Sequence, residues 1–118
     1  MPNPARASFD IELNGETYTL RPTFESIMEF NDKAGLDIFE AIDNGLNTKR
    51  TVAAIWSGIR GEEIFQNKGN TSFEEVGKIC QAHGFAKCVS LAVQYISRAV
   101  ASDNQVKKEN EENQAPQA

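Results

Sequence analysis

The chain has 118 residues, a length that suits one domain with a single modest core. Its formal net charge of −5 argues against a nucleic-acid-binding surface, because such surfaces usually cluster Lys and Arg to neutralise phosphates. The chain has two cysteines, no secretory signal and no apolar run near the roughly 20 residues that span a bilayer. We therefore expect a reduced cytoplasmic protein that binds neither nucleic acid nor membrane.

Residues 9–20 alternate between apolar and polar side chains on both sides of an Asn-Gly pair. Alternation with period two is typical of strands that have one face on the core and one in water. Asn14 and Gly15 suit the positive φ angles of a two-residue type I′ turn. The segment therefore predicts a β-hairpin. Pro22, which has no amide hydrogen, ends its second strand, and Thr23 can cap the helix that follows.

Five segments after the hairpin have apolar residues at helical spacing between capping and stop signals. The first expected helix starts at Thr23 and ends near Gly35, and the second starts at Asp37 and ends at Gly45. The third starts at Asn47 or Thr48 and has an apolar face that ends at Gly61. The fourth starts at Ser72 and has His83 in its last turn, and the fifth runs from about Phe85 to Val100.

The sequence thus predicts an α+β protein that is mainly α, with an N-terminal β-hairpin packed on about four or five short helices. An isolated hairpin is marginal in water, so its apolar face must contact the helices. We expect a disordered lead over 1–7, one domain over 8–101 and a disordered acidic tail over 102–118. Val106 is the only aliphatic side chain larger than Ala in that tail, which is too little apolar area to offset the entropy of ordering it.

One string of residues joins the hairpin to the first expected helix. It has the pattern G-x-x-Y-x-L-R-P-T-F-E, formed by Gly15, Tyr18, Leu20, Arg21, Pro22, Thr23, Phe24 and Glu25. The string resembles a family of small proteins encoded in the tail-gene clusters of siphophages and of phage-derived gene transfer agents. The resemblance continues in a V-x-A-V-x-x-G-L-x-G helix, here with Val52, Ala53, Ile55 and Gly58, and with Trp56 and Ile59 in place of the usual aliphatics. It fades after Gly84.

Members of that family are described as tail assembly chaperones, and sometimes as tail tube proteins. The resemblance implies a non-enzymatic chaperone that binds the tape measure protein and helps to recruit tail tube subunits in the cytoplasm of the bacterial host. It leaves open a phage, prophage or gene transfer agent origin, and whether the chain forms a homo-oligomer. The alternative is a structural tail tube or connector subunit that stays in the particle, although such a subunit normally relies on a larger sheet than one hairpin.

Cys80, His83 and Cys88 form the one cluster with metal-ligand chemistry, in the spacing C-x2-H-x4-C. Zinc requires a fourth ligand, and the sequence offers none nearby. A Cys-His nucleophile would need an orienting group and oxyanion donors that are not evident, and no nucleotide-binding motif is present. We therefore expect structural cysteines, no metal, no cofactor and no enzymatic activity.

Five residues are candidates for partner binding. Arg21 can pair with a nearby acid such as Glu25 or with a carbonyl at a helix end, or it can contact a partner. Trp56 can lie in the core or line a groove for a partner helix. Leu91, Val93 and Tyr95 belong to an apolar stripe on the last helix that is wider than one buried face needs. Either that helix is central, or the excess meets a partner or a second copy.

Overall fold

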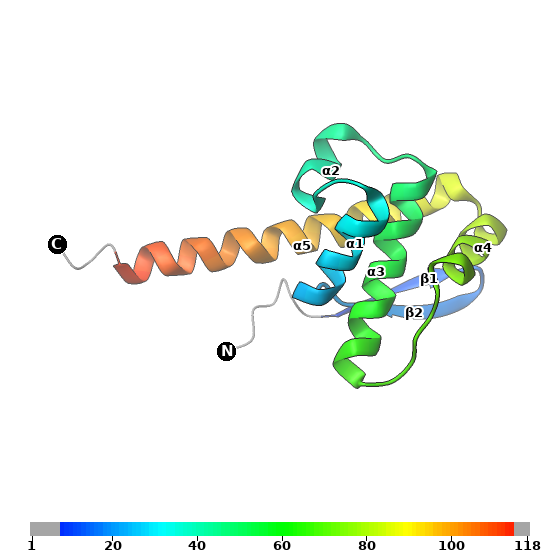
Figure 1. The fold of residues 1–118 in the computed structure, drawn as a ribbon, viewed down its shortest axis with the longest axis horizontal. Helices are drawn as coiled ribbons and strands as arrows, with labels where there is room; N and C mark the ends of the chain where they lie inside the picture. The colour runs from blue at the N-terminus through cyan, green and yellow to red at the C-terminus, as the bar shows by residue number, and fades with distance from the viewer. Residues whose placement is uncertain (1–7, 115–118) are drawn as a thin grey trace.

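The computed structural model describes the backbone of residues 8–114 and the side chains of residues 8–101. The predicted lead over 1–7 lies outside the described residues, as do residues 115–118. Within the described part the elements are β1 (Phe9–Leu13), β2 (Glu16–Leu20), α1 (Phe24–Ala34), α2 (Ile38–Asn44), α3 (Thr48–Gln66), α4 (Phe73–His83) and α5 (Phe85–Gln114). The fold is therefore mainly α with an N-terminal β-hairpin, as the sequence predicts (Figure 1).

The hairpin forms for the local reasons that the sequence indicates. β1 and β2 are antiparallel, and the turn between them has φ angles of 52° at Asn14 and 82° at Gly15. Both angles fit a type I′ turn, which matches the right-handed twist of the flanking strands. Ile11, Leu13 and Leu20 are buried, so one face of the hairpin lies on the helices.

The first four helices begin where capping side chains accept a hydrogen bond from a backbone amide of the first turn. These caps are Thr23, Asp37, Asn47 and Ser72. Gly35 and Gly45 follow α1 and α2 with positive φ angles. The predicted starts of these helices and the ends of the first two are confirmed, because caps and stops are encoded by neighbouring residues.

The third helix differs from its prediction. α3 continues through Gly61 to Gln66, and it is buried around its whole circumference from Thr51 to Ile59. It contacts α1, α4, α5 and β2, and Figure 1 shows it in the middle of the molecule. A spacing rule that looks for one apolar face predicts this helix, but it does not predict that small residues such as Ala53 and Ser57 are buried on its other sides.

The last helix also extends beyond its predicted end at Val100. α5 continues to Gln114, and its second half reaches beyond the other elements (Figure 1). The predicted helix ended at Val100 because the apolar stripe ends there. The following residues nevertheless include Lys, Glu and Gln, which favour helix, and the first proline after Val100 is Pro116. The side chains beyond residue 101 lie outside the described part of the chain, so the disordered tail remains a prediction.

Candidate partner-binding surface

The chain crosses α3 closely where it leaves β2. The Arg21 amide donates a hydrogen bond to the Gly58 carbonyl at 3.0 Å. A Cβ atom at Gly61 would overlap the backbone carbonyl of Arg21, and one at Gly58 would lie 2.8 Å from Leu20 Cβ. The two parts of the family resemblance, the R-P-T-F-E string and the glycine-containing helix, therefore contact each other at this crossing.

The side chain of Arg21 is held within the chain. Its Nε lies 2.8 Å from Glu62 Oε1, and its guanidinium carbon lies 3.7 Å from the ring centre of Phe65. The geometry supports the pairing interpretation of Arg21, with Glu62 as the acid in place of the expected Glu25. Because Glu62 is 41 residues away, local spacing could not identify it.

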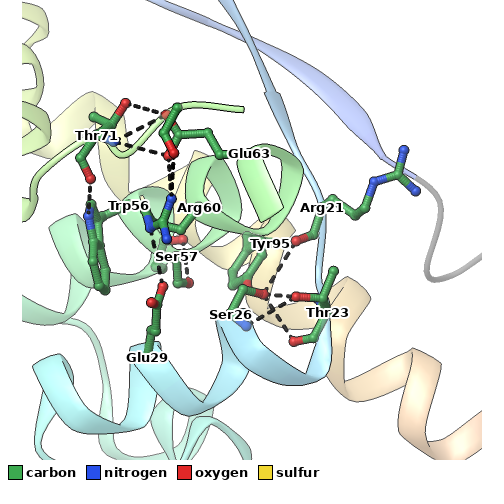
Figure 2. A network of polar contacts seen from close by, with 12 residues as sticks. Arg21, Thr23, Ser26, Glu29, Trp56, Ser57, Arg60, Glu63, Thr71 and Tyr95 are labelled. Atoms are coloured by element: carbon green, nitrogen blue, oxygen red, sulfur yellow. Dashed lines mark hydrogen bonds and ion pairs between the residues drawn. The ribbon is translucent and has the colours of Figure 1, made fainter. Parts of the chain in front are cut away.

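Tyr95 lies in the core, where its hydroxyl meets a small polar network (Figure 2). The hydroxyl is 2.9 Å from Ser26 Oγ, and the Ser26 amide donates to the Oγ1 of Thr23. Burial raises the pKa of Tyr95 to about 12, because the phenolate would be poorly solvated. The prediction that Tyr95 belongs to a partner-binding surface is corrected, since this side chain has no exposed area.

Trp56 is also a core residue, as one of its two interpretations held. Its ring meets the ring of Phe73 edge to face, with the centroids 5.9 Å apart. Its indole Nε1 donates to the Thr71 carbonyl at 2.9 Å. Only 7% of the residue is exposed, so Trp56 joins α3 to the start of α4 and offers little surface to a partner.

A second polar network fixes the loop between α3 and α4 (Figure 2). Glu63 accepts hydrogen bonds from the amide and hydroxyl of Thr71, and it pairs with Arg60 at 2.9 Å. Burial alone would raise the pKa of Glu63, but the bonds from Thr71 and Arg60 outweigh it and hold the pKa below the ordinary value. These groups are satisfied by each other, so the network is structural.

Of Cys80, His83 and Cys88, only the two cysteines are in contact, with the Cys88 thiol 3.7 Å from the Cys80 carbonyl. Both cysteines are buried and free, and burial raises the pKa of Cys80 to about 12, which disfavours the nucleophilic thiolate. His83 Nδ1 accepts a hydrogen bond from the Asn14 amide at 2.8 Å. Among the described residues, no group of three or more His, Cys, Asp and Glu could hold a metal ion.

Leu91 and Val93 lie on different sides of α5. Two residues along a helix differ by about 200° in direction, so they do not share a surface. Leu91 is half-buried against the core, whereas Val93 is 42% exposed. Of the three residues predicted for the wide stripe, only Val93 presents a substantial apolar surface to solvent.

Val93 lies in an apolar groove between α2 and α5. We define the α2–α5 groove by its lining residues, Ala41, Ile42, Gly45, Leu46, Val89, Val93 and Ile96. Its volume is about 170 Å³, which is room for one large side chain, because a cavity of about 150 Å³ can hold benzene. Ile42 is 50% exposed and Val89 is 37% exposed at its edges. A cluster of exposed apolar side chains is more informative than scattered single ones, which are normal on protein surfaces.

Sequence reasoning missed the contribution of α2 to this surface. Ile38 and Ala41 are already buried on this seven-residue helix, so Ile42 and Phe39 exceed what its inner face needs. That excess of large apolar residues on a short acidic helix was a signal available in the sequence.

Other exposed apolar side chains occur away from the groove, including Phe24 and Met28 on α1 and Phe65 at the end of α3. A wider depression between α3 and α4 is rimmed by Lys49, Lys78 and Glu74. The residues that line this depression include none of those predicted for partner binding, whereas the lining of the α2–α5 groove includes Val93.

No protein-family model matches the chain, and neither a characterised protein nor a solved structure is significantly similar to it. Among the described residues, no helix is long and apolar enough to cross a membrane.

Proposed function

We propose that the chain is a non-enzymatic tail assembly chaperone of a phage, prophage or gene transfer agent. It binds the tape measure protein in the host cytoplasm and helps to recruit tail tube subunits. The observation that supports the proposal most is the α2–α5 groove, in which Ile42, Val89 and Val93 expose aliphatic surface on an acidic body. An apolar groove of this kind suits an amphipathic helix, and a tape measure protein is long and helical.

The family resemblance supports the proposal in a second way. Its Leu20, Arg21 and Gly58 form the crossing of the hairpin over α3. These residues hold the hairpin on the central helix. Their role is thus in the fold and not in a catalytic centre. The resemblance is therefore one of architecture to the tail assembly chaperones, and the chaperone function is inferred from it.

The proposal is tested by co-expressing the tagged chain with the tape measure protein of its own gene cluster. We expect the wild type to retain the tape measure protein on affinity resin. Ile42→Asp and Val93→Asp should lose most of it, because a carboxylate in an apolar interface is desolvated without a partner. Phe24→Asp is the matched control, since Phe24 is 73% exposed and does not line the groove.

Circular dichroism checks that each variant is folded. If folded Val93→Asp retains as much tape measure protein as the wild type, the groove is not the binding site. If the wild type never binds tape measure protein and is found in finished tails, the structural tail tube or connector subunit replaces the chaperone as the proposed function.

A further inference from the structure

Gly77 lies in the interior of α4, where the fold gives no reason for a glycine. It is not one of the glycines whose φ is positive, so its backbone suits any residue. Among the described residues, an added Cβ atom would meet only Val52 Cγ1, at 3.9 Å, which is an ordinary van der Waals contact. A glycine inside a helix is less stable than an alanine. The open position at Gly77 therefore points to a use outside the packing of the described chain.

Gly77 lies on the floor of the wide depression between α3 and α4. We call it the α3–α4 depression and define it by its lining residues, Thr48, Lys49, Val52, Phe73, Glu74, Gly77, Lys78, Gln81 and Phe85. Its volume is about 550 Å³, compared with about 170 Å³ for the α2–α5 groove. Phe73, Gly77 and Gln81 recur at intervals of one helical turn, so the depression follows α4 over about 12 Å. This length accommodates two turns of another helix.

Each wall of the depression carries an exposed lysine. Lys49 is on α3 and Lys78 is on α4. Among the described residues neither lysine forms an ion pair, since the ion pairs there involve Arg21 and Arg60. The chain as a whole has a net charge of −5, so two such ammonium groups on one apolar surface are a local exception. A ligand in the depression meets positive charge from both helices.

The one carboxylate in the lining lies toward the start of α4. Glu74 is in the first turn of that helix, where a carboxylate interacts favourably with the helix dipole. Trp56 on α3 meets Phe73 at the start of α4. Val52, one turn earlier on α3, lies beside Gly77, one turn later on α4. The two helices are therefore antiparallel, and the first turn of α3 with its lysine lies away from Glu74.

We propose that the α3–α4 depression binds an amphipathic helix of a partner protein that carries Asp or Glu on both flanks of its apolar face. The apolar face packs on Phe73 and Phe85, and the helix backbone approaches α4 at Gly77, where no side chain stands between them. The flanking carboxylates pair with Lys49 and Lys78, which selects an acidic helix over a basic one. The inference does not depend on the proposed function, because it concerns a surface separate from the α2–α5 groove.

Two synthetic peptides of about 16 residues, or roughly four helical turns, test the charge selectivity. They share the same leucines on one face and carry either Glu or Lys on both flanks. Fluorescence anisotropy with the full chain should give the Glu peptide about fivefold tighter binding, the equivalent of two exposed ion pairs. The net charge of −5 would by itself favour the Lys peptide, so a preference for the Glu peptide reports a local positive surface. The preference should largely disappear at roughly 1 M salt, where the Debye length is about 3 Å.

Variants of the lining locate the bound peptide. Lys78→Glu should abolish or invert the preference between the peptides, whereas Lys68→Glu, which makes the same change at an exposed position outside the depression, should preserve it. Gly77→Leu fills the depression and should weaken the binding of the Glu peptide about tenfold. Gly77→Ala should weaken it less. Because alanine favours helix over glycine, a loss of binding in Gly77→Ala is not caused by unfolding, which circular dichroism checks.

Equal affinity of the two peptides, or no binding of either, would overturn the proposal. An unchanged preference in Lys78→Glu, or undiminished binding of the Glu peptide by folded Gly77→Leu and Gly77→Ala, would place the peptide elsewhere and overturn it as well. Light scattering tests the other occupant, a second copy of the chain. If the wild type self-associates and Gly77→Ala converts it to a monomer, the depression is a self-association surface and the proposal is wrong.

Discussion

At the scale of single residues, Gly61 decides how closely the hairpin can approach the central helix. A Cβ atom there would overlap the backbone carbonyl of Arg21, which cannot move without shifting the end of β2. Gly77 on α4 provides a contrast, because its nearest contact for an added Cβ is Val52 Cγ1 at 3.9 Å.

We therefore predict opposite effects for one added methyl group. Gly61→Ala should destabilise the protein by about 1–3 kcal/mol or more through overpacking. Gly77→Ala should be neutral or stabilise by about 0.5–1 kcal/mol, because alanine favours helix over glycine. Denaturant unfolding of both variants checks this, and similar midpoints for the two would contradict the close crossing at Gly61.

A second prediction at this scale concerns Glu63 and pH. Its folded pKa lies below the ordinary 4.5 because hydrogen bonds from Thr71 and Arg60 favour the carboxylate. This contribution to stability is present above pH 4.5 and is lost as the pH falls through the folded pKa. Glu63→Gln should therefore be less stable than wild type at neutral pH, and the difference should shrink below about pH 4.5. A difference in unfolding free energy that stays constant from neutral to strongly acidic pH would refute this.

At the scale of elements, the hairpin depends on its turn. Gly15 has φ 82° and no atom near an added Cβ, so substitution acts through the backbone and not through a clash. Gly15→Val should destabilise by about 1 kcal/mol or more, because β-branched residues avoid positive φ. Gly15→Asn should cost less, since Asn tolerates this region. Equal unfolding midpoints for the two variants would argue against the type I′ turn.

The C-terminal part of the chain gives a second prediction at this scale, which concerns thermal stability. Deleting residues 103–118 should leave the melting temperature nearly unchanged, because this segment offers little apolar area to the core. Thermal unfolding followed by circular dichroism measures the effect. A marked drop in melting temperature would show that the segment contacts the domain.

The elements that sequence predicted well are those specified by neighbouring residues. The Asn14-Gly15 turn and the caps at Thr23 and Ser72 are local signals, and each appears where expected. The central position of α3 was not predictable in this way, because it depends on contacts from four other elements. The environment of Tyr95 likewise depends on distant residues, since its hydroxyl meets Ser26, which is 69 residues away in sequence.

At the scale of the whole molecule, the structure separates candidate residues that hold the fold from those that stay exposed. Arg21, Trp56 and Tyr95 serve internal contacts. Val93 remains on the surface, joined there by Ile42 from α2. The candidate site was therefore only partly predictable, since a helical stripe does not reveal which of its sides another helix will cover.

The chaperone proposal is tested most directly by following the chain through assembly. Quantitative mass spectrometry would compare tail assembly intermediates, isolated with the tape measure protein, and finished tails. The proposal predicts that the chain accompanies the tape measure protein in the intermediates and is absent from the finished tails. A fixed stoichiometry of the chain in finished tails would contradict it.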